Sequence, residues 1–215
     1  MADEFPGSTD EEFNRREAMG AFSHEIRTPL TSIRMVLELA KREATGDSLV
    51  LDAELAQMLH TSVDDLQALA DDLQEASRIE RGRTAFSRGP CDLLAAYEAA
   101  AEMVQPKVQL EGPLPPSIDG PWDAGRLVRA LAGFAESANR VGDGSGVVRV
   151  GSDVADSRAV ITMSSGEPGG KLKPIAADVS FGFFRSRMFV LAMGGDVSWD
   201  RRERYFSVRV DLPRE

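Results

Sequence analysis

The N-terminal part of the chain carries two long runs in which apolar residues recur at steps of three and four. In the first run, from Glu11 to about Arg42, the series is Phe22, Ile26, Leu30, Ile33, Leu37 and Ala40. In the second, from about Asp52 to Arg81, it is Leu55, Leu59, Val63, Leu66, Leu69, Leu73, Ala76 and Ile79. This spacing places each series on one stripe of a helix. Because Gly46, Asp47 and Ser48 interrupt the pattern, the sequence predicts an antiparallel helical hairpin.

Such a hairpin needs a partner surface. Two helices of roughly 30 residues, each about 45 Å long, leave much of both stripes exposed when they pair only with each other. A second copy supplies the simplest cover, since an apolar stripe that meets itself across a two-fold axis is self-complementary. The sequence therefore predicts a homodimer whose hairpins form a four-helix bundle. The alternative is that the C-terminal half covers the hairpin within one chain.

The rest of the chain has a mixed pattern. Residues 1–10 are small, acidic and turn-prone, and we expect a flexible lead-in there. The hairpin occupies residues 11–83, and a linker with glycine and proline occupies residues 84–91. Helical spacing then recurs in segments 92–104, 123–140 and 180–193, and strand patterns in segments 107–110, 147–150, 158–163, 196–199 and 205–212. Residues 92–215 are thus predicted to be an α/β sandwich, with helices on one side of a mixed sheet, and the whole chain to be α+β.

Composition excludes several kinds of partner. The chain has 35 acidic and 25 basic residues, a net charge of −10, which argues against nucleic-acid binding because that needs clustered cations. A single cysteine, Cys91, is typical of reducing compartments and cannot build a multi-thiolate metal site. The sequence lacks a bilayer-spanning apolar run and the pattern of a signal peptide. We therefore expect a cytoplasmic protein without membrane contact in this part of the chain; segments upstream would change that expectation. The second helix carries what we interpret as a solvated acidic surface, made of Asp64, Asp65, Asp71 and Asp72.

One histidine on the first helix stands in a reactive context. His24 lies two residues after Phe22, so it is expected to point away from the apolar stripe and into solvent. A lone surface histidine is usually only solvated surface, but its neighbours here favour chemistry. Pro29 removes a backbone donor from the helix interior and clashes with the carbonyl of Glu25, at a cost of about 3 kcal/mol. A helix that retains this defect beside an exposed histidine is expected to use it.

The neighbours also suggest roles. Glu25 can orient the imidazole or take its proton, which leaves a nitrogen lone pair free as nucleophile. Thr28 lies one turn further on the same side of the helix and can position a water molecule beside a phosphorylated imidazole. Arg27 can balance the charge of a phosphoryl group.

The run from residue 22 to residue 33 resembles the phospho-acceptor box of bacterial sensor histidine kinases. The resemblance implies that His24 is the phospho-acceptor, that Glu25 is the acid/base neighbour and that Thr28 is the water-positioning residue of phosphatase chemistry. It assigns supporting positions to Arg27 and Pro29. In this family the dimeric bundle precedes an ATP-binding α/β sandwich, and the C-terminal half of this chain is similar to that domain in the order of its elements.

The nucleotide-binding landmarks of that family are degenerate here. By the resemblance, Gly133 and Ser137 replace the two Mg²⁺-binding asparagines. Ser164 replaces the aspartate that reads adenine, and Pro168 replaces a glycine of the adenine-binding turn. One glycine of the phosphate loop remains. A hydroxyl cannot supply the charge-assisted bond of a carboxylate, Mg²⁺ demands well-placed oxygen ligands, and phosphates need close backbone approach. We therefore expect no productive ATP binding, no resident cofactor and no metal site. The degenerate positions are Gly133, Ser137, Ser164, Pro168, Ser180 and Gly182.

The resemblance thus implies a histidine phosphotransfer protein of two-component signalling, without ATP-dependent autokinase activity. His24 would exchange a phosphoryl group with an aspartate in the receiver domain of a response regulator, and that partner would supply Mg²⁺. Two alternatives stay open. One is a divergent but active ATP-dependent sensor histidine kinase. The other is a regulator that binds a receiver domain without transferring phosphate, or that uses Thr28 only to remove it.

Overall fold

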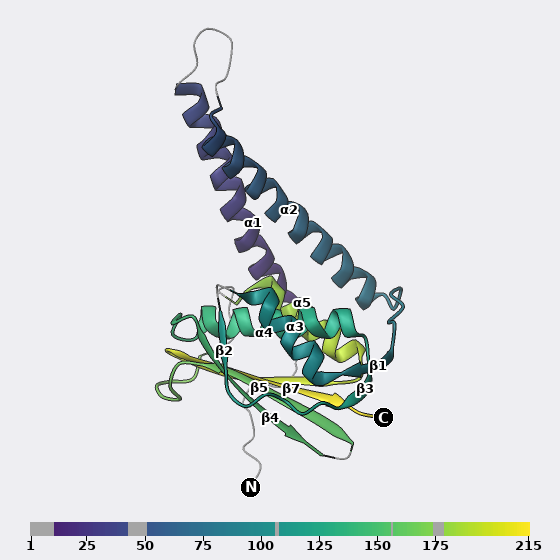
Figure 1. Ribbon diagram of the computed structural model, residues 1–215. Helices are drawn as coiled ribbons and strands as arrows, with labels where there is room; N and C mark the ends of the chain where they lie inside the picture. Colours follow the sequence, from purple (N-terminus) through teal and green to yellow (C-terminus); the bar gives the residue numbers. More distant parts are fainter. Residues whose placement is uncertain (1–10, 43–50, 106–107, 156, 174–178) are drawn as a thin grey trace.

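The computed structural model describes residues 11–42, 51–105, 108–155, 157–173 and 179–215. Helix α1 (Glu11–Arg42) and helix α2 (Ala53–Glu80) form the predicted antiparallel hairpin, which stands on the C-terminal domain (Figure 1). Asp52 caps α2 by accepting a hydrogen bond from the Leu55 amide at 2.8 Å, which satisfies one of the free amides of a helix start. The lead-in and the predicted break at residues 46–48 lie outside the described residues.

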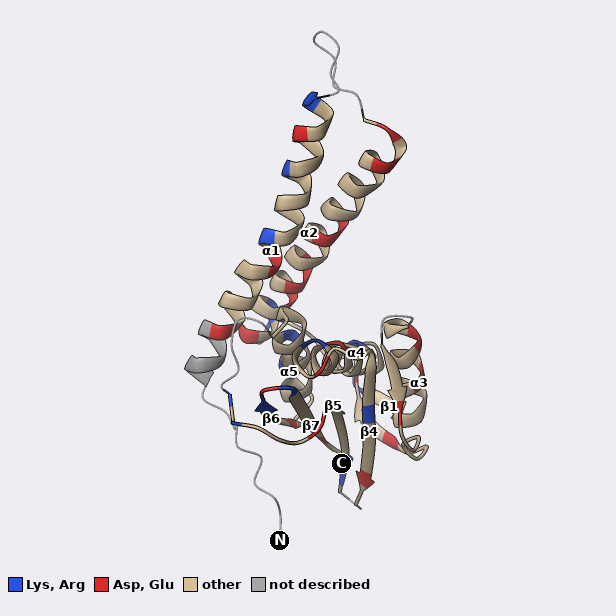
Figure 2. Ribbon diagram, turned by 90° about the vertical axis from the view of Figure 1, so that its left-hand side faces the viewer, with Lys and Arg blue, Asp and Glu red and all other residues tan. Residues whose placement is uncertain are grey.

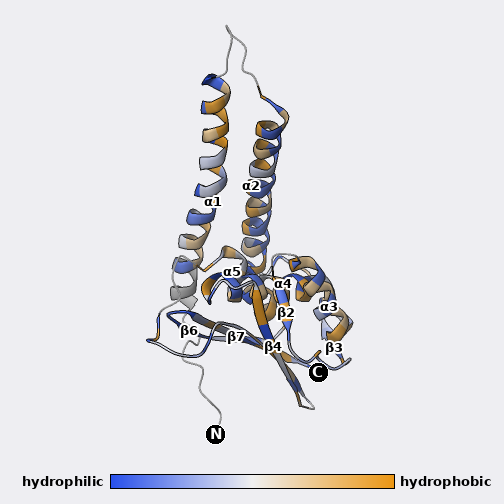
Figure 3. Cartoon of the chain, turned by 60° about the vertical axis from the view of Figure 1, so that its left-hand side comes forward, coloured by the Kyte–Doolittle hydropathy of each residue, from blue (hydrophilic) through white to orange (hydrophobic). Residues whose placement is uncertain are grey.

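The buried residues of α1 match the predicted series only in part. Ala21, Val36 and Ala40 are fully buried, whereas Leu30 and Leu37 are 50% and 39% exposed. The prediction that these two leucines face inward is therefore wrong for the single chain. Ala21 and Val36 each precede a residue of the predicted series by one position, whereas Ala40 belongs to that series. Apolar surface consequently remains along both helices above the C-terminal domain (Figure 3).

The C-terminal domain is built on a five-stranded mixed sheet with the strand order β2-β4-β5-β7-β6. Strand β2 (Gln109–Glu111) pairs in parallel with β4 (Val147–Val154), and the pairs formed by β5 (Arg158–Ser165), β7 (Tyr205–Pro213) and β6 (Asp196–Arg202) are antiparallel. Helices α3 (Leu93–Val104), α4 (Ala124–Val141) and α5 (Phe181–Ala192) cover one side of the sheet (Figure 1). The predicted α+β architecture is confirmed.

Two short strands were not predicted. Strand β1 (Gly89–Asp92) begins inside the segment predicted as a linker, and it pairs with β3 (Asp119–Trp122) in the proline-rich segment. Pro90 stands opposite Pro121 in this pair. Prolines cannot donate ladder hydrogen bonds and are usually confined to edges, so the local sequence gives little strand signal.

The core of this domain centres on the phenylalanines of α5. The ring of Phe183 makes edge contacts with four other rings, at centroid distances from 5.6 to 5.8 Å. These contacts join α5 to α4 and to the last two strands, and they involve Phe134, Phe184, Trp199 and Phe206. Gly194, at φ +84°, follows α5 in the left-handed conformation that stops a helix. Helix α5 is therefore held rigidly against the sheet, and its N-terminus is held in place with it.

Among the described residues, no helix combines the length and the hydropathy needed to cross a bilayer.

Candidate functional site

His24 is exposed on α1, as predicted, and Arg27 and Thr28 on the following turn are exposed with it. Pro29 is buried and α1 continues through it. On either side of the proline, side-chain hydroxyls donate to carbonyls four residues back in the helix. They belong to Ser23, Thr31 and Ser32, at 2.8, 2.7 and 3.3 Å. The segment is thus an intact helix that presents the imidazole to solvent beside a threonine and a cation.

Glu25 turns toward the C-terminal domain. Its Oε1 accepts a hydrogen bond from Nη1 of Arg140 on α4 at 2.9 Å, and another at 3.2 Å from the backbone N–H of Phe181, the first residue of α5. The carboxylate therefore lies at the positive end of a helix dipole. Burial raises the pKa of Glu25 above its usual value; the charge of Arg140 and the Phe181 amide act against this, and the negative charge of Asp72 adds to it.

An aromatic contact reinforces this junction. The ring of Phe22 meets the ring of Phe181 edge-on, with centroids 5.3 Å apart and planes at 65°. Phe22 is half-buried, and it packs against α5 of the C-terminal domain. Arg140 and Phe181 are thus site residues that the sequence reasoning missed, because they lie 115 and 156 positions from Glu25 and no local motif links them to it.

An ionic cluster fixes α2 to the same domain. Asp72 accepts from Arg129 at 3.1 Å and also from Arg185, while Glu75 accepts from Arg126 at 3.2 Å and from Arg129 at 2.7 Å. Figure 2 shows acidic residues on the lower part of α2 beside basic residues of the C-terminal domain. The interpretation of Asp72 as a purely solvated residue was therefore wrong, since its side chain is only 16% exposed. The other three aspartates of that surface, Asp64, Asp65 and Asp71, are exposed.

Four of the degenerate positions meet between α4 and α5. The hydroxyls of Ser137 and Ser180 share a hydrogen bond of 2.9 Å, and the Ser137 hydroxyl also donates to the Gly133 carbonyl at 2.7 Å. A Cβ on Gly133 would lie 2.4 Å from Oγ of Ser186 and 3.2 Å from the Gly182 carbonyl oxygen. The two helices are thus in direct contact at these positions. These positions offer hydroxyls and backbone carbonyls, without the amide side chains that the resemblance led us to look for there.

The remaining degenerate positions lie on another element. Ser164 belongs to β5, and Pro168 is exposed in the turn after that strand. Asn139, close in sequence to Ser137, accepts the Gly146 amide through its Oδ1 at 2.8 Å, so its side chain stabilises the loop after α4. In the part of the chain that the structure describes, no three His, Cys, Asp or Glu side chains gather as metal ligands.

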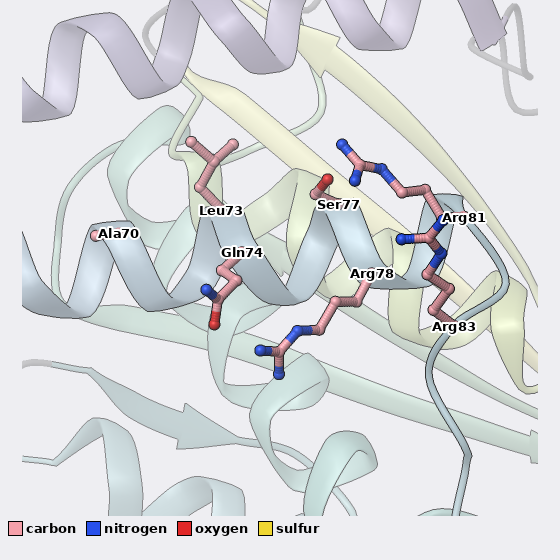
Figure 4. A pocket seen from close by; sticks show the side chains of 7 residues that line it. All are labelled: Ala70, Leu73, Gln74, Ser77, Arg78, Arg81 and Arg83. Carbon is pink, nitrogen blue, oxygen red and sulfur yellow. The ribbon is translucent and has the colours of Figure 1, made fainter.

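Two open grooves follow the hairpin. One of about 540 Å³ runs along α2 and is lined by Ala70, Leu73, Gln74, Ser77, Arg78, Arg81 and Arg83 (Figure 4). The other, of about 310 Å³, is lined by Ser23, Ile26, Arg27, Leu30, Thr31 and Arg34 of α1. The residues that line the second groove flank His24 in the sequence, but His24 is not among them. The groove combines apolar side chains with two arginines.

Comparisons with known proteins agree with this arrangement. Residues 14–82 match the His Kinase A (phospho-acceptor) domain. Signal transduction histidine-protein kinase BaeS of Escherichia coli strain K12 is 29% identical over 160 residues, 72% of this chain and 33% of BaeS. The probable sensor histidine kinase TcrY of Mycobacterium tuberculosis is 32% identical over 137 residues, 62% of this chain and 28% of TcrY. The chain thus spans a third or less of the length of these relatives.

Solved structures show the same fold. The Acinetobacter baumannii histidine kinase AdeS superposes with a TM-score of 0.70 at 18% identity, over 89% of this chain and 98% of that one. Histidine kinase ThkA, solved in complex with the response regulator protein TrrA, gives a TM-score of 0.58 at 14% identity, over 95% of this chain and 62% of that one. A helical hairpin followed by an α/β domain is the architecture that they share with this chain.

Proposed function

We propose that this chain, a bacterial sensor histidine kinase-like protein with a phospho-acceptor domain, transfers phosphoryl groups without using ATP. Its similarity to these kinases supports histidine phosphotransfer in two-component signalling. His24 takes a phosphoryl group from a phosphorylated aspartate of a response-regulator receiver domain, and it can return the group to such an aspartate. One combined observation supports this: the acceptor segment is intact and exposed, while α4 and α5 are bonded to each other through Ser137 and Ser180.

The reaction needs only a positioned nucleophile. The lone pair of one imidazole nitrogen of His24 attacks phosphorus, the bond from phosphorus to the aspartyl oxygen breaks, and the aspartate leaves as a carboxylate. The other ring nitrogen releases its proton, which Glu25 or solvent accepts. Arg27 and Arg34 bring positive charge to this side of α1, and Mg²⁺ held by the receiver domain would supply further neutralising charge. Transfer then depends mainly on alignment.

A receiver domain as partner has independent support. The related kinase ThkA has been solved in complex with a response regulator, and the exposed side of α1 around His24 carries the cations Arg27 and Arg34. An aspartyl phosphate with its acidic surroundings suits such a surface. We place the receiver domain there.

A homodimer belongs to the same proposal. Leu30, Leu37 and Val63 are 50%, 39% and 50% exposed along the hairpin, and a second copy would cover them in a four-helix bundle. Light scattering of the purified chain tests this directly. A monomeric mass at micromolar concentration would contradict the dimer.

The transfer experiment uses a receiver domain that carries ³²P on its aspartate. Label is expected on this protein, to be lost with His24→Ala and kept with His60→Ala, which changes an exposed histidine of α2. Absence of label under conditions in which a known phosphotransfer protein is labelled would overturn the proposal. Incubation with labelled ATP and Mg²⁺ tests its second half. Incorporation that His24→Ala abolishes, or a higher melting temperature in the presence of ATP, would show that the chain is instead an ATP-dependent kinase.

A further inference from the structure

We propose that Arg140, on α4 of the C-terminal domain, is a positioning residue for the His24 site: it binds and orients the Glu25 carboxylate next to the acceptor histidine in the sequence, so that the retained domain takes part in transfer. This inference rests on the proposed function. It gives the C-terminal domain a task that needs no nucleotide.

The geometry supports a positioning contact. Arg140 Nη1 and the Phe181 amide both donate to Oε1 of Glu25, at 2.9 and 3.2 Å, so neither of them occupies Oε2. A carboxylate held through one oxygen keeps its other oxygen free of these two donors. The edge contact between Phe22 and Phe181 fixes the preceding turn of α1 against the same helix end. The contacts of Phe22 and Glu25, which lie on either side of His24 in the sequence, therefore restrain this turn of α1.

The charges around Glu25 single out Arg140. Glu25 is 18% exposed and Arg140 is 43% exposed in their side chains. The groups that act on the carboxyl are Arg140 from α4, the positive N-terminus of α5 at Phe181, and Asp72 from α2, which opposes them. Arg140 is the one full positive charge among them. Without it, a partly buried carboxyl would face Asp72 with only a backbone amide in support, and it would bind a proton more readily.

Docking of the domain does not depend on this contact alone. Asp72 and Glu75 of α2 bind three other arginines of the C-terminal domain. Loss of Arg140 should therefore leave the domain docked and Glu25 buried. This separates a positioning role from a purely structural one, because the protonation of Glu25 should change while the fold does not.

The experiment compares Arg140→Gln and Arg140→Lys in the full chain. A matched control is Arg149→Gln, which removes another α/β-domain arginine whose ion-pair partner, Glu167, is exposed. One measurement follows the Glu25 carboxyl carbon by ¹³C NMR through a pH titration. The other follows transfer from a phosphorylated receiver domain to His24 across the same pH range.

With Arg140→Gln, Glu25 should titrate at higher pH than in the wild type. Transfer to His24 should slow by about tenfold, which is part of the ~100-fold or more that a general base contributes to a rate. Arg140→Lys should restore both, and Arg149→Gln should change neither. If Arg140→Gln does not fold, the wild type is titrated at high salt instead. About 1 M salt screens a partly exposed ion pair, so it should raise the pH at which Glu25 titrates.

A Glu25 titration and a pH profile of transfer that are unchanged in Arg140→Gln, or unchanged at high salt, would overturn the inference. The two proposals fail in different ways. An unlabelled wild-type His24 refutes the transfer function, whereas the NMR titration reports the link between Arg140 and Glu25 without any phosphate.

Discussion

Gly133 lies where α4 packs against α5, and replacing it with alanine tests how close that contact is. In a helix interior, alanine is normally more stable than glycine by about 1 kcal/mol. Here the added Cβ would come within 2.4 Å of Ser186 Oγ and 3.2 Å of the Gly182 carbonyl oxygen. Overpacking of a rigid core costs about 1–3 kcal/mol. We therefore expect Gly133→Ala to lower the free energy of unfolding by roughly 1 kcal/mol, the opposite of the usual sign.

Ser186 provides the control. Its hydroxyl is buried, and no hydrogen-bond partner for it is found in the described structure, so Ser186→Ala should cost little and removes the nearest clashing atom. In that background Gly133→Ala should be neutral or should stabilise by up to about 1 kcal/mol. Urea denaturation of the four proteins, followed by tryptophan fluorescence, gives the coupling energy. If Gly133→Ala stabilises equally in both backgrounds, the close contact between α4 and α5 is refuted.

The same reasoning covers a return to the family residue. Gly133→Asn adds the same Cβ and a longer side chain, so it should destabilise α4 against α5 and should not restore nucleotide binding. Denaturation and a melting experiment with ATP check both parts.

Three further predictions concern the junction and the acid stability of the fold. Phe22→Ala should lower stability by about 1–2 kcal/mol, and a double-mutant cycle with Phe181→Leu should show coupling. Asp72→Asn leaves two half-buried arginines short of a partner and should lower the free energy of unfolding by about 2 kcal/mol, less than the loss of a fully buried pair. The exposed control Asp71→Asn should change it by no more than about 0.5 kcal/mol, and denaturation measures both. Burial raises the pKa of Asp123, but bonds from two amides and an arginine outweigh it and hold the pKa below the usual value. Its stabilisation is therefore present above about pH 4 and is lost as pH falls through the lower folded pKa. Asp123→Asn should flatten this acid dependence in urea melts from pH 7 to pH 2.

Periodicity predicted the long helices well and their contact surface poorly. The helix bounds follow from apolar spacing over many turns, so α1 and α2 begin and end within one residue of the prediction. Which row lies between two helices depends instead on how closely they approach. Of the predicted series, Ala40 is buried, whereas Leu30 and Leu37 are exposed in the single chain. Ala21 and Val36 are buried although the prediction did not name them.

The site divides in the same way. Exposure of His24 follows from its phase on the helix, and that prediction is confirmed. The roles of Thr28 and Arg27 stay predictions. The bond between Glu25 and Arg140 joins residues 115 positions apart, and an acidic and a basic residue in a chain rich in both give no signal before the fold brings them together.

The described contacts between the hairpin and the C-terminal domain lie on its lower turns, and they include Phe22 and Glu25 of α1 and Asp72 and Glu75 of α2. The length of the hairpin above them is consequently free to vary. Seven extra residues in each helix above this level would extend the hairpin by about 10 Å and would leave every one of those bonds in register. A chain built in this way can change its reach toward other molecules in evolution without rebuilding the machinery at its base.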